Sequence, residues 1–273
     1  MEELRGRNAL ITGAGGGLGE YIARALAAEG ANLALTDLPG APVDELAAEL
    51  RDRGLRVEHA AADLSQAADR ARLVEWASEA LGPIDVLVNN AGIEFGGPFV
   101  GTTEGELEAI VTVNLLAVMD LTRLVLPGMQ ERRRGHVVNV ASLAGKAPAP
   151  YLASYSATKH GVVGFTHSLR AEHGSEPVGF SVICPVFISR VGMYGRVEDQ
   201  VGPNPIGTLP PERVGEAAVR AIRDNPAELI VSGPAVRPLV WLYALFPGTA
   251  AKLARNRRSL DFAERVAKAG GRL

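Results

Sequence analysis

The chain has 273 residues, of which 47% are hydrophobic and 22% are charged, and these proportions are typical of a globular protein with one large domain or two small ones. The net charge of −3 gives no overall basic field, and the sparse aromatic residues (5%) do not interleave with a basic run, so we expect no nucleic-acid partner. Cys184 is the only cysteine, which excludes an intrachain disulfide and fits a reducing compartment.

Short β-branched runs alternate with amphipathic stretches rich in alanine and leucine along most of the chain. In chain order, the runs predict strands at 8–12, 31–36, 56–60, 85–89, 136–141, 178–184 and 229–231. The stretches between them predict helices at 18–29, 43–53, 66–81, 103–129 and 154–173. Nearly all-apolar strands that alternate with helices indicate a parallel sheet covered on both faces. With right-handed crossovers, the prediction is an α/β fold with a Rossmann-like, doubly wound, seven-stranded parallel sheet.

Two regions interrupt this alternation. Residues 185–210 are rich in proline and glycine, and we expect a mobile loop beside the functional site. Residues 233–273 are helical in pattern but follow the last predicted strand. Because no internal repeat or linker is apparent, we expect a Rossmann-fold domain at 1–232 and a helical extension at 233–273. The extension would belong to the same domain, as a lid or an interface.

A cluster of glycines joins the first predicted strand to the first predicted helix. A pyrophosphate binds at such a turn against backbone N–H groups, where the helix dipole favours negative charge and side chains would block its approach. A flexible turn is the alternative, but the position at the first βα junction favours a dinucleotide site. The residues expected to hold this cofactor are Gly13, Gly15, Gly16, Gly17, Leu18 and Gly19.

Asp37 ends the second predicted strand, 24 residues after Gly13. A carboxylate there accepts hydrogen bonds from the ribose hydroxyls of an adenosine and repels a 2′-phosphate. Neither Gly16 nor Leu38, which we also place in the cofactor site, supplies a basic side chain, so we predict NAD in preference to NADP. The alternative is that Asp37 is only a turn residue or a helix cap.

Asp63 and Leu64 follow the third predicted strand and are further candidates for the cofactor site. The Asp63 carboxylate would bond the adenine edge. Equally, it would cap the helix that begins near Ser65.

Tyr155 and Lys159 lie four residues apart, on one face of a predicted helix. The free tyrosine pKa of about 10 is too high for a base at neutral pH, and a nearby ammonium group lowers it. An exposed helix pair is the alternative. Ser142 favours proton transfer, because it follows the fifth predicted strand at the sheet edge where ligands bind. The alternative for Ser142 is a loop or capping serine.

Asn114 is a polar residue within an apolar stretch of the fourth predicted helix. An amide is costly to bury without partners, so it either holds a water molecule or bonds a backbone group. The main alternative is that Asn114 has a purely structural role.

In their order and spacing, these motifs resemble those of the short-chain dehydrogenase/reductase family. The resemblance extends from residue 8 to about 190 and includes Asn90, Ala91 and Gly92. It implies that Tyr155 exchanges the proton at the substrate oxygen, while Lys159 lowers the tyrosine pKa and binds the nicotinamide ribose. It further implies the remaining roles: substrate orientation by Ser142, a water-linked proton relay through Asn114, and cofactor lining by the Asn90, Ala91 and Gly92 segment.

The family resemblance also implies cofactor contacts from Pro185 and Ile188, and dimers or tetramers formed through the two long helices at 103–129 and 154–173. The chain departs from the family pattern after the sixth strand. Val186 replaces a glycine, and Arg190 stands where a threonine usually bonds the carboxamide. Ser189 would supply the hydroxyl from the adjacent position.

The segment 237–258 has an apolar stretch at 239–246, followed by Lys252, Arg255, Arg257 and Arg258. One interpretation is an interfacial helix in weak peripheral contact with a membrane. The favoured alternative is that Trp241, Tyr243 and Phe246 close the substrate site or pack on a partner subunit. Both interpretations suggest a lipophilic substrate.

Together these features predict an enzyme that interconverts a secondary alcohol and a ketone by direct hydride transfer with NAD. The alternatives are an NADPH-dependent carbonyl reductase and a non-catalytic NAD-binding sensor. The five histidines form no recognisable ligand pair, so we expect no metal site. Because neither a signal core nor a window of about 18 apolar residues is apparent, we expect a cytoplasmic location, with a membrane-peripheral position as the alternative.

Overall fold

A computed structural model describes residues 3–174, 177–202, 204–254 and 257–270 of the chain. Its centre is one seven-stranded sheet in the order β3-β2-β1-β4-β5-β6-β7, with every neighbouring pair parallel. The strands are β1 (Asn8–Thr12), β2 (Asn32–Asp37), β3 (Val57–Ala61), β4 (Val86–Asn89), β5 (Gly135–Val140), β6 (Val178–Pro185) and β7 (Glu228–Val231). The predicted doubly wound α/β fold is confirmed.

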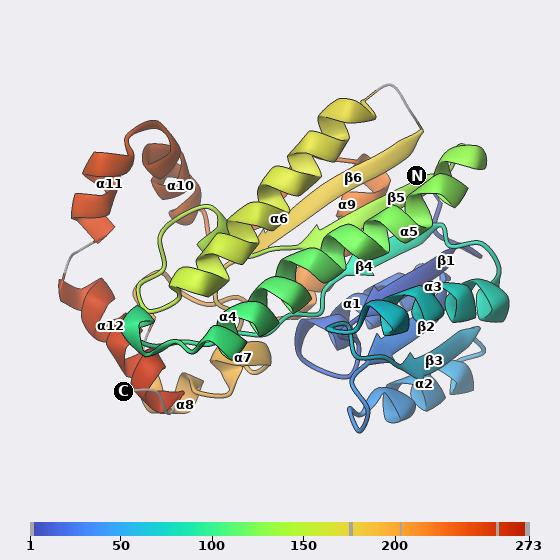
Figure 1. Ribbon diagram of the computed structural model, residues 1–273, viewed down its shortest axis with the longest axis horizontal. Coiled ribbons are helices and arrows are strands. Elements are labelled where there is room, and N and C mark those ends of the chain that lie inside the picture. Colours follow the sequence, from blue (N-terminus) through green and yellow to red (C-terminus); the bar gives the residue numbers. More distant parts are fainter. Residues whose placement is uncertain (1–2, 175–176, 203, 255–256, 271–273) are drawn as a thin grey trace.

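Helices cover both faces of the sheet, so the strands need apolar side chains on both sides. One face carries α1 (Gly17–Ala28), α2 (Val43–Asp52) and α9 (Glu212–Asp224); the other carries α3 (Ala67–Leu81), α4 (Glu104–Val111), α5 (Ala117–Glu131) and α6 (Ala153–Glu172) (Figure 1). Adjacent residues of one strand therefore enter different cores. Ile11 of β1 packs with the α1 side, and its neighbour Leu10 packs with the α3 side.

The strand order reverses between β1 and β4, because β2 and β3 lie on one side of β1 and β4 to β7 on the other. Open α/β sheets bind ligands beyond the carboxyl ends of the strands at such a reversal. The glycine turn follows β1 and the Asn90 segment follows β4, so both lie at this point.

Three elements differ from the prediction. The expected single helix at 103–129 is two α-helices joined by a π-helical turn at Thr112–Leu116. Helix α9 was not predicted at all. Within the loop expected at 185–210, the chain forms the short helices α7 (Gly192–Gly195) and α8 (Glu198–Val201), and Ile188 pairs with Leu209 in an isolated bridge.

The expectation that no window of 18 apolar residues exists was wrong. By length and composition alone, the continuous helical stretch Glu104–Glu131 is apolar enough to cross a membrane, with a mean hydropathy of 1.8 in its best window. Residues of this stretch enter the core against β4, β5 and α3. A core helix passes the same test, so the composition of this stretch does not indicate a membrane span.

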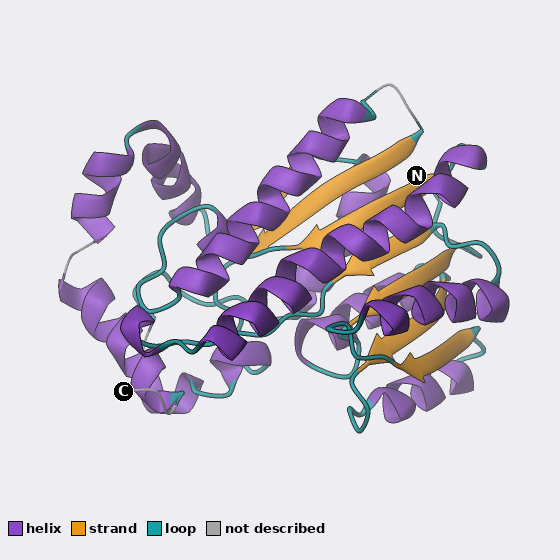
Figure 2. Cartoon of the chain, viewed as in Figure 1, coloured by secondary structure: helices purple, strands orange, loops and turns teal. Residues whose placement is uncertain are grey.

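The extension after β7 forms α10 (Val236–Leu245), α11 (Pro247–Ala254) and α12 (Arg257–Ala269) (Figure 2). Helix α12 packs under the short helices of the 185–210 segment, where Phe262 meets Phe187 and Tyr194 with ring centroids 5.7 and 6.2 Å apart. Helix α10 inserts only two fully buried side chains, Val236 and Val240.

Candidate active site

The glycine turn begins at Gly13, whose backbone has a positive φ of 66°. A Cβ at Gly13 would lie 2.8 Å from the Cα of Ala91, and one at Gly19 would lie 1.9 Å from the Gly13 carbonyl oxygen. Glycine is therefore required at both positions to pack β1, α1 and the β4 end together. Gly16 precedes α1 and makes no side-chain cap, so the first N–H groups of this helix are left for an anion.

Asn90 and Ala91 tie the end of β4 to this turn. The Asn90 amide nitrogen donates to the carbonyl oxygens of Thr12 and Gly13, at 3.0 Å each. The backbone N–H groups of Asn90 and Ala91 both donate to the Thr12 hydroxyl at 3.1 Å. These bonds link the end of β4 to the glycine turn after β1 and so hold the turn in one conformation.

Asp37 lies at the end of β2, beside the same turn. One carboxylate oxygen accepts the Gly15 N–H at 2.9 Å, and the other accepts the Leu38 N–H at 2.7 Å. The carboxylate is thus oriented at the glycine turn. The Leu38 side chain is 53% exposed and brings no charge to this position.

Asp63 accepts the Ser65 N–H at 2.9 Å and closes a turn before α3, whose cap is Gln66. Hydrogen bonds from Ser65 hold the pKa of Asp63 below its usual range. Leu64 is buried beside it, and its carbonyl accepts from Arg70 at 2.8 Å.

Tyr155 and Lys159 are both buried on the face of α6 that meets β5. The Lys159 Nζ donates to the Val140 carbonyl at 3.0 Å and lies 5.6 Å from the centre of the Tyr155 ring. Ser142, just beyond β5, caps the turn that follows by accepting the Ala144 N–H at 3.1 Å, and its hydroxyl is close enough to Tyr155 to lower the pKa of that side chain. The loop after Ser142 is pressed onto α6, since a Cβ at Gly145 would lie 2.6 Å from the Lys159 carbonyl oxygen. The structure therefore brings these three predicted residues together.

Burial dominates the electrostatics of this group. It lowers the pKa of Lys159 to about 8. It raises the pKa of Tyr155 above the ordinary tyrosine value, and the charge of Glu94 raises it further, while the hydrogen bond with Ser142 acts in the opposite direction. The sequence predicted a lowered tyrosine pKa, and the net shift in the structure is upward because desolvation of the phenolate outweighs its stabilisation.

Asn114 is fully buried in the π-helical turn. Its side-chain oxygen accepts the Ile93 N–H, and its amide nitrogen donates to the Ile93 carbonyl, both at 2.8 Å. A weaker contact of 3.3 Å reaches the Thr158 hydroxyl. Asn114 thus bonds a backbone segment, as one of the two interpretations predicted, and a Cβ at Gly92 would lie 3.3 Å from its oxygen.

The segment after β6 positions the remaining candidates. Pro185 ends β6, and Val186 and Ile188 are buried beyond it. The Ser189 hydroxyl donates to the Leu209 carbonyl at 3.3 Å. Arg190, in the left-handed region with a φ of 67°, pairs with Glu212 at 2.7 Å and is 56% exposed, so this arginine is held at the surface.

Sequence reasoning missed Glu94, which is partly buried two residues after Gly92. Burial raises its pKa to about 7, and the positive charge of Lys159 partly opposes this shift. No sequence motif marks the residue. Its only signal is a carboxylate directly after the segment of Asn90, Ala91, Gly92 and Ile93.

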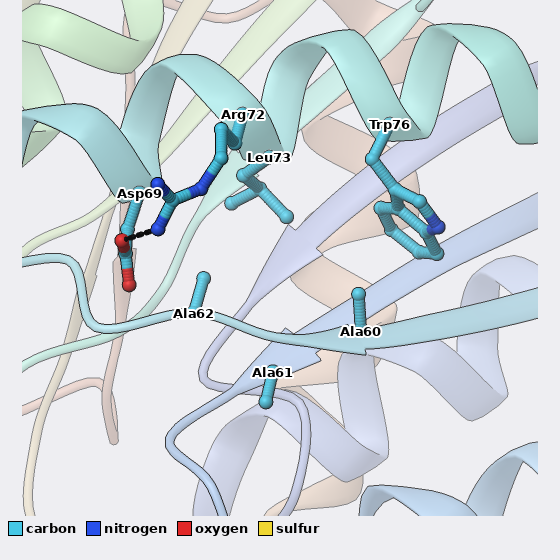
Figure 3. A pocket seen from close by; sticks show the side chains of 7 residues that line it. All are labelled: Ala60, Ala61, Ala62, Asp69, Arg72, Leu73 and Trp76. Carbon is cyan, nitrogen blue, oxygen red and sulfur yellow. Dashed lines mark hydrogen bonds and ion pairs between the residues drawn. The ribbon is translucent and has the colours of Figure 1, made fainter.

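A pocket at the sheet edge is separate from this site (Figure 3). It lies between β3 and α3, where Arg72 pairs with Asp69, and none of the residues predicted for the cofactor or the chemistry lines it. Its lining residues are Ala60, Ala61, Ala62, Asp69, Arg72, Leu73 and Trp76. Among the described residues, no group of three histidine, cysteine or acidic side chains is placed to hold a metal.

Comparison with known proteins places this site in a family. The model for short chain dehydrogenases matches residues 7–201. The ketoacyl reductase HetN of Nostoc sp. is 40% identical over 233 residues, which are 85% of this chain and 80% of that protein. Estradiol 17-beta-dehydrogenase 11 of Rattus norvegicus is 33% identical over 264 residues, which are 96% of this chain and 87% of that protein.

A solved structure has the same architecture. The short-chain dehydrogenase/reductase from Burkholderia phymatum, determined in complex with NAD, superimposes with a TM-score of 0.81 at 28% identity, covering 94% of this chain and 98% of that one. The family match, the relatives and the seven-stranded sheet agree with the motifs. The chain belongs to the short-chain dehydrogenase/reductase family and is an oxidoreductase that acts on CH–OH groups.

Proposed function

We propose that the protein interconverts a secondary alcohol and a ketone with NAD(H), with Tyr155 as the acid/base residue. The observation that carries this proposal is the buried pair of Tyr155 and Lys159 beside the half-buried Ser142 at the carboxyl end of β5. A binding-only protein has no need of a buried tyrosine beside an ammonium group, which argues against the sensor alternative.

The glycine turn fits a dinucleotide, because the uncapped start of α1 offers N–H groups and Gly13 and Gly19 keep the backbone free of side chains. The nicotinamide ring of such a cofactor supplies the hydride acceptor or donor. Asn90, Ala91 and Gly92 line the same space from β4. Leu38, Asp63, Leu64, Pro185 and Ile188 complete the proposed set of cofactor contacts.

During alcohol oxidation, Tyr155 takes the proton from the substrate hydroxyl, and during ketone reduction it returns one. The Lys159 ammonium stabilises the phenolate and binds the nicotinamide ribose. Ser142 donates a hydrogen bond to the substrate oxygen and so holds it beside the tyrosine. Asn114 keeps the Ile93 backbone in place, next to Gly92 and Lys159, and supports a proton relay to solvent.

The preference for NAD over NADP follows from Asp37. Its carboxylate is oriented by Gly15 and Leu38 and retains lone pairs for the ribose hydroxyls. A 2′-phosphate at the same place would meet this negative charge without a basic residue nearby.

A lipophilic substrate is supported by the extension. The four side chains of Leu239, Trp241, Leu245 and Phe246 are between 42% and 71% exposed on or just after α10. The relative that aligns with nearly the whole chain is named for estradiol, a lipophilic alcohol. We assign this apolar surface, within 237–258, to weak peripheral contact with a membrane from which such a substrate partitions. Arg255 of this range lies outside the described residues. The enzyme is otherwise cytoplasmic, with 1–232 as its Rossmann-fold domain and 233–273 as its extension.

We further assign the exposed sides of α4, α5 and α6 to a homodimer or homotetramer interface. Val111, at the end of α4, and Leu116, in the π-helical turn, are 47% and 44% exposed, and an interface here would cover both side chains. Sedimentation equilibrium tests this assignment, and a monomer at micromolar concentration would contradict it.

The deciding experiment follows NAD⁺ reduction by absorbance across secondary alcohols from short chains to sterols, with Tyr155→Phe as control. We expect turnover that rises with apolar size and is lost in the variant. Turnover only with NADP(H) would favour the carbonyl reductase alternative. Tight NADH binding without turnover of any alcohol or ketone would favour the sensor.

A further inference from the structure

The segment 92–97 runs alongside the beginning of α6 in the opposite direction. At one end, a Cβ at Gly92 would lie 3.5 Å from the Lys159 Nζ. At the other end, the Gly97 N–H donates to the Tyr151 carbonyl at 2.8 Å. Along the chain, Tyr155 lies midway between Tyr151 and Lys159, the two residues that contact the segment. Glu94 lies between Gly92 and Gly97, the residues that make these contacts. Glu94 is therefore level with the acid/base tyrosine.

The backbone around Glu94 is held from both sides. Asn114 bonds both the N–H and the carbonyl of Ile93, and a Cβ at Gly96 would lie 3.4 Å from a methyl carbon of Leu152. Ile93 and Phe95 pack in the apolar cluster that contains Tyr155. Glu94 is the one ionisable residue in this segment, and its neighbours Ile93 and Phe95 are apolar.

Within the described part of the chain, the Glu94 carboxylate has no hydrogen bond or ion pair. Its charge nevertheless acts on both Tyr155 and Lys159, so it shares their site. A carboxylate that is partly removed from water without a hydrogen-bond partner costs free energy, and the charge of Lys159 compensates this cost only in part. Carboxyl groups with strongly shifted pKa values are often found at functional sites. A ligand that brings a hydrogen-bond donor to this place would satisfy the carboxylate.

We propose that Glu94 determines substrate specificity: it accepts a hydrogen bond from a second donor, a hydroxyl or amine near the reacting carbon, and it rejects substrates with a carboxylate there. The inference rests on the proposed alcohol oxidation. A charge-assisted hydrogen bond to Glu94 stabilises the bound substrate that carries the donor, because the bond forms away from bulk water. A substrate carboxylate would face a like charge and would also lose its own hydration.

The test compares kcat/KM for 1,2-octanediol, 2-octanol and 3-hydroxyoctanoate with NAD⁺, in the wild type and in Glu94→Gln. We expect the wild type to prefer the diol over both others. In Glu94→Gln the diol preference should fall about tenfold, the loss typical of a hydrogen bond to a charged group, while the hydroxy acid gains. The control is Glu75→Gln, an exposed residue of α3, which should leave all three ratios unchanged.

A pH series provides a readout that a structural role would not affect. With a pKa near 7, Glu94 is protonated below neutrality, so the ratio of diol to hydroxy acid should fall as the pH drops from 8 to 6. Tyr155 on α6 and Cys184 on β6 have raised pKa values and keep their protons over this range. Lys159, with a pKa of about 8, gains charge as the pH falls and also favours the hydroxy acid, so the difference between the wild type and Glu94→Gln measures the contribution of Glu94. In Glu94→Gln the ratio should change less with pH than in the wild type, because only Lys159 still titrates.

Identical substrate ratios in the wild type and Glu94→Gln, at every pH, would overturn the assignment. If the wild type oxidises none of the three alcohols with NAD⁺ or NADP⁺, the proposed function fails instead. Calorimetric binding of the diol and the hydroxy acid to the enzyme–NADH complex then tests Glu94 alone. Tighter binding of the diol than of the hydroxy acid by the wild type, with this preference lost in Glu94→Gln, supports the assignment. The same preference in both proteins contradicts it. Circular dichroism checks that the variant is folded.

Discussion

The beginning of α6 and helix α10 lie at the same end of the sheet, but they are held in opposite ways (Figure 1). Around α6, polar side chains are buried and bonded: Lys159 to the Val140 carbonyl, and Asn114 to the Ile93 backbone. On α10, the large apolar side chains face outward, and only Val236 and Val240 are fully buried. Chemistry thus depends on groups fixed by the protein itself, whereas the extension leaves an apolar surface that only a ligand, a membrane or another copy can cover.

The largest expected effect comes from a change at the beginning of α6, where the polar groups are buried and bonded. Tyr155→Phe removes the hydroxyl that exchanges the proton, so kcat should fall by about 10²–10⁴-fold while NADH affinity stays at the wild-type value. Absorbance kinetics and fluorescence titration measure the two quantities. Tyr21→Phe on α1 is the matched control. Full activity in Tyr155→Phe would transfer the acid/base role to another residue.

Asn114→Ala removes the partner of both Ile93 backbone groups inside the core. Because each buried polar group left unpaired costs about 1–3 kcal/mol, the free energy of unfolding should fall by about 2–4 kcal/mol. Chemical denaturation measures the loss, and Gln66→Ala, at an exposed helix cap, should change little. A stability equal to the wild type would mean that water replaces the amide without cost.

Asp37→Ala tests the carboxylate at the end of β2, which the Gly15 and Leu38 N–H groups orient. Loss of its hydrogen bonds to the ribose, and of its repulsion of a 2′-phosphate, should reduce the preference for NAD over NADP by about tenfold or more. The ratio of kcat/KM values for the two cofactors measures this change. Asp44→Ala on α2, whose side chain is 82% exposed, is the control. An unchanged ratio would remove Asp37 from the ribose site.

The smallest effect on folding is expected on α10. Leu245 is 71% exposed, so Leu245→Ser should change the free energy of unfolding by no more than about 0.5 kcal/mol. Val240→Ser, which places a hydroxyl in a site that is 2% exposed, should cost several times more. Leu245→Ser should nevertheless weaken cosedimentation with phosphatidylserine vesicles, because apolar area is lost from the interface. Equal vesicle binding by Leu245→Ser and the wild type would remove Leu245 from the membrane contact.

Helix α9 could have been predicted, because its buried residues Val214, Ala217, Ala218 and Ala221 follow the helical period after a pair of prolines. Its packing on α1 is a tertiary property: a Cβ at Gly215 would lie 2.6 Å from the Tyr21 carbonyl oxygen. The π-helical turn at Thr112–Leu116 has no comparable signal in the sequence. It places Asn114 so that its side chain bonds the Ile93 backbone, which is distant in the chain.

The sequence by itself determined the α/β class, the strand alternation, the glycine turn, and the identity of Ser142, Tyr155 and Lys159 as a group. Each of these depends on local periodicity or on a residue type at a short spacing. Only the tertiary structure decided that Tyr155 is buried, which raises its pKa, and that Glu94 lies near it. Burial and charge coupling arise between segments distant in the chain, here 92–97 and α6, and no local pattern encodes them.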